Sequence, residues 1–372
     1  MSQNPETVPS INPMTNVLDQ SAYWYTWLVN PIAAALVQVG VPQMIPVDGS
    51  SVHVAQLAQQ AKVDADLLYR YMRYLSAVGL FKELPDKHFV HNDSSKRLLP
   101  GHLNFYHLVI YGSTMLKAST EFVTQLRDPS KSAFEHAFQM PIWQHFAQNP
   151  ELEKHFADYM AIESNESMPG ILQNIKLPET GIVADVGGGH GQALLEFLKA
   201  NPKLTGIVYE IPTVAQLAEE GLKRSNPPSD SIFSKYTLDV KKRVSVVAGN
   251  YNEATQLKKI SNADVFFFRW IFHDNNDEVC RKILAGLYQV MKLTAKIIIC
   301  DCVLKHTPNE WTIPIALDLI MASEINGKER TKDEWIQLLC NGDGYQFNIS
   351  FDDCKIGRSE MDLITVTKKP IY

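Results

Sequence analysis

The stretch from Gly181 to Pro212 constrains the fold of this chain more than any other. It opens with an apolar, β-branched run typical of a buried parallel strand, and that run ends in a cluster of glycines. An apolar helical face and a second strand follow, and the second strand ends in Glu210. Glu210 follows the last glycine by about 20 residues, the spacing of the acid that binds a ribose diol in nucleoside-binding βαβ units. The complete succession of strand, glycine turn, helix, second strand and acid predicts an adenosine-containing ligand. The glycines alone would also fit a tight turn that binds no ligand.

The glycine pattern indicates which adenosine ligand to expect. It reads D-x-G-x-G-x-G and stops one position short of the dinucleotide spacing, with its residues at Asp185, Gly187, Gly189 and Gly191. A carboxylate inside the turn would repel a pyrophosphate but attract an ammonium group. S-adenosylmethionine carries an α-ammonium and no phosphate. The sequence therefore favours S-adenosylmethionine over NAD as the cofactor.

Length and charge restrict the class of protein. A chain of 372 residues fits two domains, each able to bury a core. The net charge of -6 gives no electrostatic reason to expect nucleic acid or an anionic membrane, so a small-molecule substrate is expected. The five cysteines are odd in number and lack C-x-x-C spacing, so neither a disulfide framework nor a metal site is predicted. The first residues do not resemble a secretory signal, which makes a cytoplasmic location the expectation.

The N-terminal part of the sequence has the pattern of a winged helix. Residues 1–17 are expected to form a mobile tail, and residues 18–39 a helix. Two further helices are expected between residues 52 and 84, followed by a hairpin made of LFKEL and HFVH. The second of these helices would begin at Asp64 and present one apolar face, made of Leu67, Leu68, Tyr71, Leu75 and Val78.

A winged helix raises the possibility of DNA binding. Residues 52–100 hold seven basic and five acidic side chains, a small excess for a surface that grips phosphates. No nucleic-acid partner is therefore expected, although a winged-helix regulator remains an alternative.

The rest of the chain predicts a helical linker and then an α/β domain. Residues 104–168 are aromatic and helical in pattern, and they are expected to line a substrate pocket. From residue 169 onward strands alternate with helices, which predicts a parallel sheet with ligands at the carboxyl ends of its strands. The strands are expected at residues 181–186, 205–210, 243–248, 263–270, 296–304, 346–351 and 361–367.

Three residues near the ends of these strands form a candidate catalytic group. His273 follows the fourth strand, and imidazole is the side chain best suited to take a proton near neutral pH. Asp301, on the next strand, and Glu329, in the sequence GKERT, could each hold the imidazole N–H. A capping box of Thr331 and Glu334 explains part of GKERT as a helix start, but it leaves Glu329 unexplained.

These motifs resemble those of the S-adenosylmethionine-dependent O-methyltransferases of the caffeate and acetylserotonin type. The resemblance extends from about residue 21 to the C-terminus and rests on DVGGGHG at 185–191, YEIP at 209–212, HDNND at 273–277 and GKERT at 327–331. It implies a Rossmann-like methyltransferase sheet, mostly parallel with an antiparallel terminal strand. It also implies an N-terminal all-helical winged-helix dimerisation domain over residues 18–103, and hence a homodimer.

The resemblance also implies roles for individual residues. His273 would be the catalytic base, flanked by Asp301 and Glu329. The cofactor would be held by Asp185, Gly187, Gly189, Gly191, Glu210, Asn250, Tyr251 and Arg269. A small aromatic hydroxyl substrate would contact Asp274, Met321, Trp143 and Met160. No metal and no membrane partner are expected.

The sequence departs from the family pattern at several positions, among them Glu210, whose carboxylate length differs from the usual one, and Arg269, where the family usually has lysine. Asn275 stands where the family usually has a tryptophan that covers the adenine, and Asn250 replaces an aspartate. Asp301 has a shorter arm than the usual glutamate, which puts its reach to His273 in question. These departures keep open the alternative of a family member with non-methylating chemistry, such as decarboxylation or hydroxylation.

Overall fold

The structure is a computed structural model that describes residues 25–112, 114–228, 231–305, 311–340, 342, 344–357 and 359–369. The chain divides into two compact units between Leu116 and Lys117. The tail expected at residues 1–17 and the start of the helix expected at residues 18–39 lie outside the described residues. Within the described part, no helix combines the length and the apolar character needed to cross a membrane.

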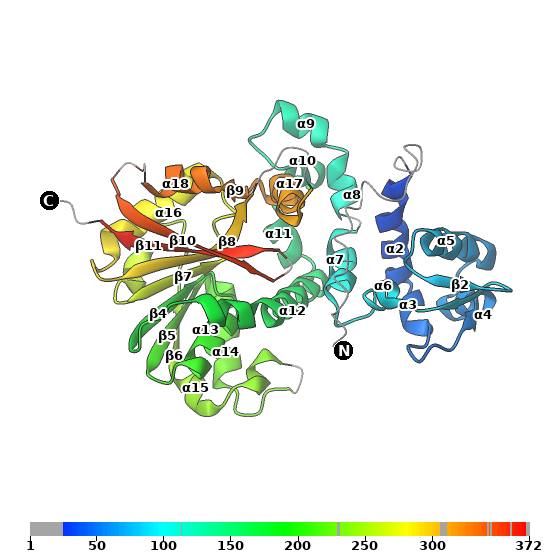
Figure 1. Ribbon diagram of the computed structural model, residues 1–372, viewed down its shortest axis with the longest axis horizontal. Coiled ribbons are helices and arrows are strands. Elements are labelled where there is room, and N and C mark those ends of the chain that lie inside the picture. The colour runs from blue at the N-terminus through cyan, green and yellow to red at the C-terminus, as the bar shows by residue number, and fades with distance from the viewer. Residues whose placement is uncertain are drawn as a thin grey trace, which may run out of the picture. The chain divides into compact units, whose positions relative to one another are not determined.

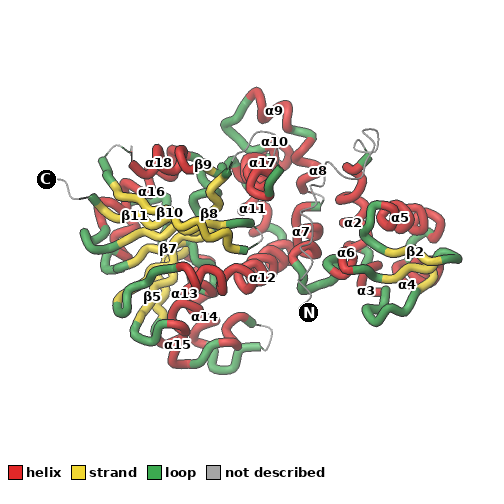
Figure 2. The backbone as a smooth tube through the Cα atoms, in the orientation of Figure 1, coloured by secondary structure: helices red, strands yellow, loops and turns green. Residues whose placement is uncertain are grey.

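The N-terminal unit is helical apart from one small sheet (Figures 1 and 2). The two helices of the winged pattern are α4 (Val54–Ala61) and α5 (Ala65–Ala77). Asp64 caps α5 as expected, because its Oδ1 accepts the N–H of Leu67 at 2.8 Å. The other helices of this part are η1 (Thr26–Leu28), α2 (Val29–Gln38), α3 (Val41–Met44), α6 (Asp93–Lys96) and α7 (Leu103–Tyr111).

The expected hairpin forms the wing. Strands β2 (Lys82–Leu84) and β3 (His88–Val90) pair antiparallel, and β1 (Val52–His53) adds a third strand on the other side of β3. The sequence had not indicated β1, because two residues are too short to show an alternating pattern.

The apolar face expected for α5 is partly wrong. Leu68, Met72 and Leu75 are buried, whereas Leu67 and Val78 are 41% and 40% exposed. Residues three and four apart share one side of a helix, so Met72 completes the face with Leu68 and Leu75. The flexible thioether side chain of methionine fills irregular gaps in a core, which suits Met72 to the buried face of α5.

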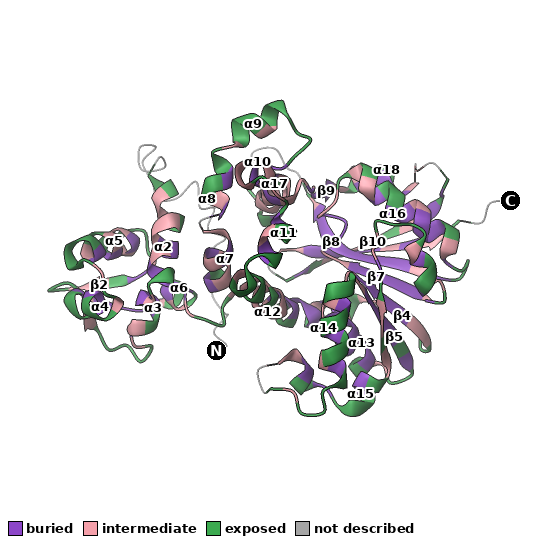
Figure 3. Cartoon of the chain, turned by 180° about the vertical axis from the view of Figure 1, so that it is seen from behind, coloured by how far each residue is buried: buried purple, intermediate pink, exposed green. Residues whose placement is uncertain are grey.

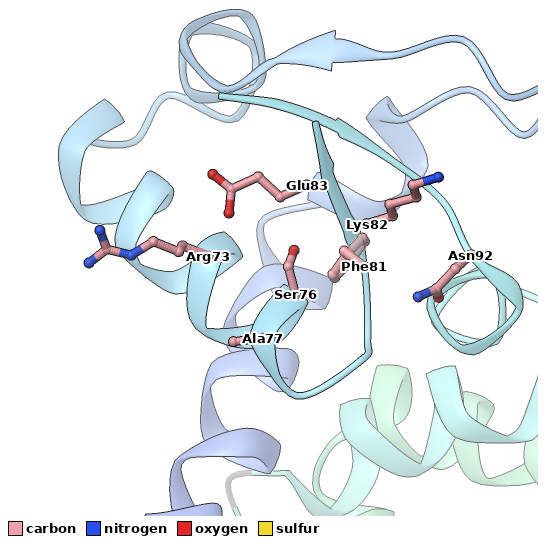
Figure 4. A pocket seen from close by; sticks show the side chains of 7 residues that line it. All are labelled: Arg73, Ser76, Ala77, Phe81, Lys82, Glu83 and Asn92. Carbon is pink, nitrogen blue, oxygen red and sulfur yellow. The ribbon is translucent and has the colours of Figure 1, made fainter. Parts of the chain in front are cut away.

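A shallow hollow of about 500 Å³ opens on this unit between α5 and β2 (Figure 4). Figure 4 shows that it is lined by Arg73, Ser76, Ala77, Phe81, Lys82, Glu83 and Asn92. All seven residues belong to the N-terminal unit, and none of the expected site residues is among them.

The second unit is built on a mostly parallel sheet, as predicted (Figure 1). Its strands are β4 (Gly181–Val186), β5 (Leu204–Glu210), β6 (Val244–Ala248), β7 (Val265–Arg269), β8 (Lys296–Leu304), β10 (Phe347–Ile356) and β11 (Met361–Lys368). They stand in the order β10-β11-β8-β7-β4-β5-β6, with β4 to β8 parallel and β11 antiparallel to β8. Each expected strand is found within a few residues. A short strand that was not expected, β9 (Arg330–Thr331), pairs with the end of β8.

Helices cover both faces of this sheet and bury it, as the purple strands of Figure 3 show. One core lies under α16 (Asp277–Val290), η3 (Gln256–Ile260) and α18 (Lys332–Cys340). The other lies under α12 (Pro150–Asn174), α13 (Gln192–Ala200), α14 (Pro212–Lys223), η2 (Ile232–Lys235) and α15 (Leu238–Lys242). Because both faces are covered, the carboxyl ends of the parallel strands are left to carry the polar site.

The segment expected to be a helical linker is helical but broken into short pieces. These are α7 and then α8 (Thr114–Ser119), α9 (Phe122–Arg127), α10 (Ala133–Phe138) and α11 (Ile142–Ala147), followed by the long α12. The boundary between the two units falls inside this segment. Helix α17 (Ile313–Ile325) packs against α10 and β8, which brings the C-terminal part of the chain to these helices.

Candidate active site

The glycine turn after β4 takes a backbone conformation that suits glycine. Gly187 and Gly189 have φ values of +70° and +56°, in the left-handed region. A Cβ at Gly187 would come within 2.4 Å of Ile271 Cδ1, so this position has no room for a side chain. A Cβ at Gly189 would meet nothing within 4 Å. The turn is therefore packed on one side and open at Gly189, where a ligand could approach the backbone.

Glu210 ends β5 beside this turn, as the spacing predicted. Its Oε1 accepts the N–H of Gly189 at 3.1 Å, and its Oε2 accepts the N–H of Ile211 at 2.8 Å. Burial raises the pKa of this carboxyl, while the two N–H donors act in the opposite direction. Each carboxylate oxygen keeps a lone pair that could accept a ligand hydroxyl.

Asp185 lies directly under the turn. A Cβ on Gly188 would come within 2.4 Å of its Oδ2, and that oxygen has no hydrogen-bond partner in the described part of the chain. Burial raises the pKa of Asp185 to about 7, and the charge of Arg269 opposes the rise. A buried carboxyl of this kind is stabilised by a cation. The open Gly189, the free lone pairs of Glu210 and the unpartnered Asp185 together fit a nucleoside with an ammonium group, as S-adenosylmethionine is.

Asn250 and Tyr251 follow β6, and the structure brings one of them to the turn. A Cβ on Gly187 would lie 3.5 Å from Cε1 of Tyr251, so the tyrosine ring borders the glycines. The Asn250 side chain is engaged in its own loop, where its Oδ1 accepts the N–H of Asn252 at 3.0 Å.

Arg269, at the end of β7, is held by helix α12. Its Nη1 donates to Glu163 Oε2 at 2.6 Å and to Ser167 Oγ at 3.3 Å, and its Nη2 donates to Ser164 Oγ. These partners were not predicted, because they lie about a hundred residues earlier in the chain. They fix the guanidinium next to the cofactor side of the sheet edge.

His273 is clamped between two carboxylates. Its Nδ1 lies 2.8 Å from Glu329 Oε1, and its Nε2 lies 3.2 Å from Asp274 Oδ1. The ring is 6% exposed. Burial lowers its pKa, but the charges of Glu329 and Asp274 outweigh burial and raise the pKa well above 6.5. When the ring is protonated, Nδ1 donates to Glu329 and Nε2 donates to Asp274.

Asp301 supports this histidine indirectly. Its Oδ1 accepts the backbone N–H of Trp270 at 2.9 Å, and its Oδ2 has no partner among the described residues. Trp270 has a φ of +57°, and its ring lies 4.6 Å from the His273 ring at an angle of 32°. Burial raises the pKa of Asp301 to about 7, against the charge of His273. The aspartate thus fixes the backbone of a tryptophan whose tilted ring contacts the imidazole, instead of holding the imidazole N–H itself.

The loop around His273 is held by residues to which the sequence had given no role. Asp318 Oδ1, on α17, accepts the N–H of Glu329 at 2.9 Å. The buried Arg330 donates to the carbonyl oxygens of Phe272 and Asn275, each at 2.8 Å. One indication of this role was present in the sequence. Arg330 lies inside the motif GKERT, and an arginine that is buried there requires hydrogen-bond partners.

The expected acceptor residues are only partly brought together. Asp274 contacts His273 directly, and the carbonyl of Met321 accepts the N–H of Gly327 at 3.0 Å in the loop before Glu329. Trp143, on α11, is 48% exposed and its ring packs on the rings of Phe146 and Phe156. Met160 is half-buried on α12. Among the described residues, no hydrogen bond, ion pair or ring contact joins Trp143 or Met160 to His273.

The chain is similar to proteins of known type. Residues 118–346 match the family model of the O-methyltransferase domain. The (R,S)-reticuline 7-O-methyltransferase of Papaver somniferum is 28% identical over 337 residues, which cover 84% of this chain and 87% of the relative.

Two solved structures share the fold. The mitomycin 7-O-methyltransferase has a TM-score of 0.79 at 20% identity, over 94% of this chain and 96% of that one. Human N-acetylserotonin methyltransferase, solved in complex with S-adenosylmethionine, has a TM-score of 0.74 at 17% identity, over 96% of this chain and 100% of that one.

Proposed function

The chain belongs to the O-methyltransferase family and takes its methyl group from S-adenosylmethionine, and from this premise we propose that it methylates a phenolic hydroxyl with His273 as the general base. The observation that carries the proposal is the buried imidazole, held at Nδ1 by Glu329 at 2.8 Å and aimed through Nε2 at Asp274. The acceptor is a small aromatic molecule, in keeping with relatives that are named for reticuline and mitomycin.

The glycine turn and its neighbours hold the cofactor in this proposal. Glu210 accepts hydroxyl groups of the ribose, and Gly189 allows close approach to the backbone. Asp185 provides a negative charge for the ammonium group at the amino-acid end of the cofactor. When bound, S-adenosylmethionine supplies a methyl group on a positively charged sulfur.

His273 removes the proton of the acceptor hydroxyl. A phenol with a pKa near ~10 and a free imidazole near ~6.5 differ by roughly 5 kcal/mol, at about 1.36 kcal/mol per pKa unit. Glu329 narrows this gap, because its charge raises the pKa of the His273 ring. The rest of this free-energy difference is overcome because the proton is lost in concert with attack of the oxygen and because the two reactants are aligned. An aliphatic alcohol is far less acidic, so the acceptor is aromatic.

Asp274 must release Nε2 before the base can act. In the free enzyme an Nε2 proton is donated to Asp274 Oδ1, so that nitrogen has no lone pair to offer. An acceptor hydroxyl that enters between Nε2 and Asp274 replaces this contact. As the hydroxyl enters, the Nε2 proton passes to Asp274 and from there to solvent, which leaves Nε2 with a lone pair. The ring then keeps its Nδ1–H bond to Glu329 and accepts the hydroxyl proton at Nε2.

The N-terminal unit serves as the dimer contact in this proposal. Tyr25 and Trp27 are each 62% exposed, and tyrosine and tryptophan are enriched in protein–protein interfaces. A second copy of the chain is the expected partner.

The function is tested by incubating the full chain with S-adenosylmethionine carrying a labelled methyl group and a panel of phenols, catechols and aliphatic alcohols. We expect label in aryl methyl ethers and none in the alcohols. Label in alkyl ethers, or binding of the cofactor without any transfer to phenols, would contradict the proposal.

A further inference from the structure

The last turn of α17 carries a buried carboxyl group that the mechanism above does not use. Glu324 is 2% exposed, and neither of its carboxyl oxygens has a hydrogen-bond partner in the described part of the chain. Burial raises its pKa to about 7. Buried polar groups almost always have partners, so an unpartnered carboxyl in a native fold calls for a functional explanation.

The place of Glu324 ties it to the acceptor side of the site. It lies three residues after Met321, and residues three apart lie on the same side of a helix. The chain then turns at Gly327, whose N–H donates to the carbonyl of Met321 at 3.0 Å. A Cβ on Gly327 would come within 2.1 Å of His273 O, and Lys328 donates its N–H to the same oxygen at 2.8 Å. Glu324 thus stands one turn from a loop that packs on the catalytic histidine.

The charges around this loop favour a cation. Asp318 and Glu324 are both carboxyl groups on α17 whose pKa is raised by burial. Three cationic side chains on segments next to His273 are already paired, Arg269 with Glu163, Lys328 with Glu334 and Arg330 with Asp277. An acceptor that brings a carboxylate would meet like charge without a free counter-ion among these residues, whereas an ammonium group would find an unpartnered carboxyl.

On the basis of the proposed function, we infer that Glu324 binds a positively charged nitrogen of the acceptor and selects phenols that carry a basic amine over phenols that carry a carboxylate. The ammonium donates to the Glu324 oxygens that have no partner among the described residues, which places the phenolic end of the molecule toward His273. Glu324 acts on the choice of acceptor and takes no part in the proton transfer.

The test uses three catechols that share a ring and differ in the charge of the side chain. Dopamine is cationic, N-acetyldopamine is neutral and 3,4-dihydroxyphenylpropionic acid is anionic. For the wild-type chain we expect kcat/KM to fall in that order, by at least tenfold from the first to the last. The Glu324→Gln variant should lose at least tenfold in kcat/KM for dopamine and stay within threefold of wild type for N-acetyldopamine.

A second measurement separates a selective role from a structural one. Because the carboxyl of Glu324 has no partner to lose among the described residues, Glu324→Gln should keep or raise the Tm of the free protein, and dopamine should no longer raise it. Glu196→Gln is the matched control, since Glu196 lies on α13 and accepts the hydroxyl of Tyr236 at 2.7 Å. We expect that variant to keep the wild-type order of the three catechols.

The inference is overturned if Glu324→Gln keeps the preference for dopamine, or if its Tm falls below that of the wild type. Failure of the proposed function gives a different result, because then no catechol of the three is methylated although the cofactor binds.

Discussion

The two halves of the sheet edge are built in different ways. The cofactor half, at β4 and β5, is made by backbone conformation, with left-handed glycines and one carboxylate that accepts the N–H of Gly189 at 3.1 Å. The base half, at β7, β8 and α17, is made by side chains that hold one another, with His273 between Glu329 and Asp274.

The two halves also differ in what the described residues leave without a partner. The cofactor half is open at Gly189 and needs a ligand to fill it. In the base half the side chains are buried and bonded mainly to one another. One carboxyl oxygen each of Asp301 and Glu329 has no partner in the described part of the chain. We therefore expect substitutions in the base half to change the rate, and substitutions in the cofactor half to change binding.

The largest effect is expected from His273→Ala. Loss of a positioned general base lowers kcat by about 10²- to 10⁴-fold, while the Kd for S-adenosylmethionine stays within about twofold, because no cofactor-side contact is removed. Rates from labelled methyl transfer and Kd from calorimetry test this on the same sample. His88→Ala, which removes a ring that contacts Asp86 O at 3.1 Å in the hairpin of the N-terminal unit, is the control and should keep the wild-type rate.

Glu329→Gln is expected to act on the same base with a smaller effect. The amide keeps a contact with Nδ1 but removes the charge that raises the pKa of His273, so the ring becomes a weaker base. We expect kcat to fall on the order of 10- to 100-fold with little change in the Kd of the cofactor. A Glu329→Gln enzyme with the wild-type kcat would show that the charge of Glu329 is not needed.

Gly189→Ala tests the cofactor half. Its Cβ would enter the open space over the turn, so we expect the Kd for S-adenosylmethionine to rise about tenfold, which is about 1.4 kcal/mol. Gly344→Ala is the matched control, since Gly344 also has a positive φ, of +84°, and a Cβ added there would likewise meet no atom within 4 Å. Both variants should lose about 1 kcal/mol of stability from the strained backbone, but only Gly189→Ala should lose affinity.

The same contrast explains what could be predicted from the sequence. The cofactor half lies within one short stretch, so spacing alone placed Glu210 beside the glycine turn, where it accepts the Gly189 N–H. The strands of the sheet were also predicted within a few residues, because buried parallel strands are nearly continuous apolar runs. The family match makes the chain an enzyme, which sets aside the alternative of a winged-helix regulator.

The base half could be predicted only in outline. Glu329 lies 56 residues from His273, and no local pattern joins them. The sequence therefore offered Glu329 only as one of two candidates to hold the imidazole N–H, and the resemblance implied that both flank the histidine. The roles of Trp270 and Asp318 could not be predicted, because each depends on a hydrogen bond between strands or helices that only the packed fold brings together. The expected contact of Asp301 with His273 is replaced by one with the backbone of Trp270, as its short side chain had suggested.

The central claim of the proposal is that His273 rests as an imidazolium between Glu329 and Asp274 and becomes the base once its Nε2 proton has passed to Asp274. A nuclear magnetic resonance titration of the His273 ring, in the free full-length protein and in Asp274→Asn, tests it most directly. We predict a midpoint well above 6.5 in the wild type, because the two carboxylates raise the pKa, and a lower midpoint in the variant. A wild-type midpoint at or below 6.5, or one that Asp274→Asn leaves unchanged, would contradict the claim.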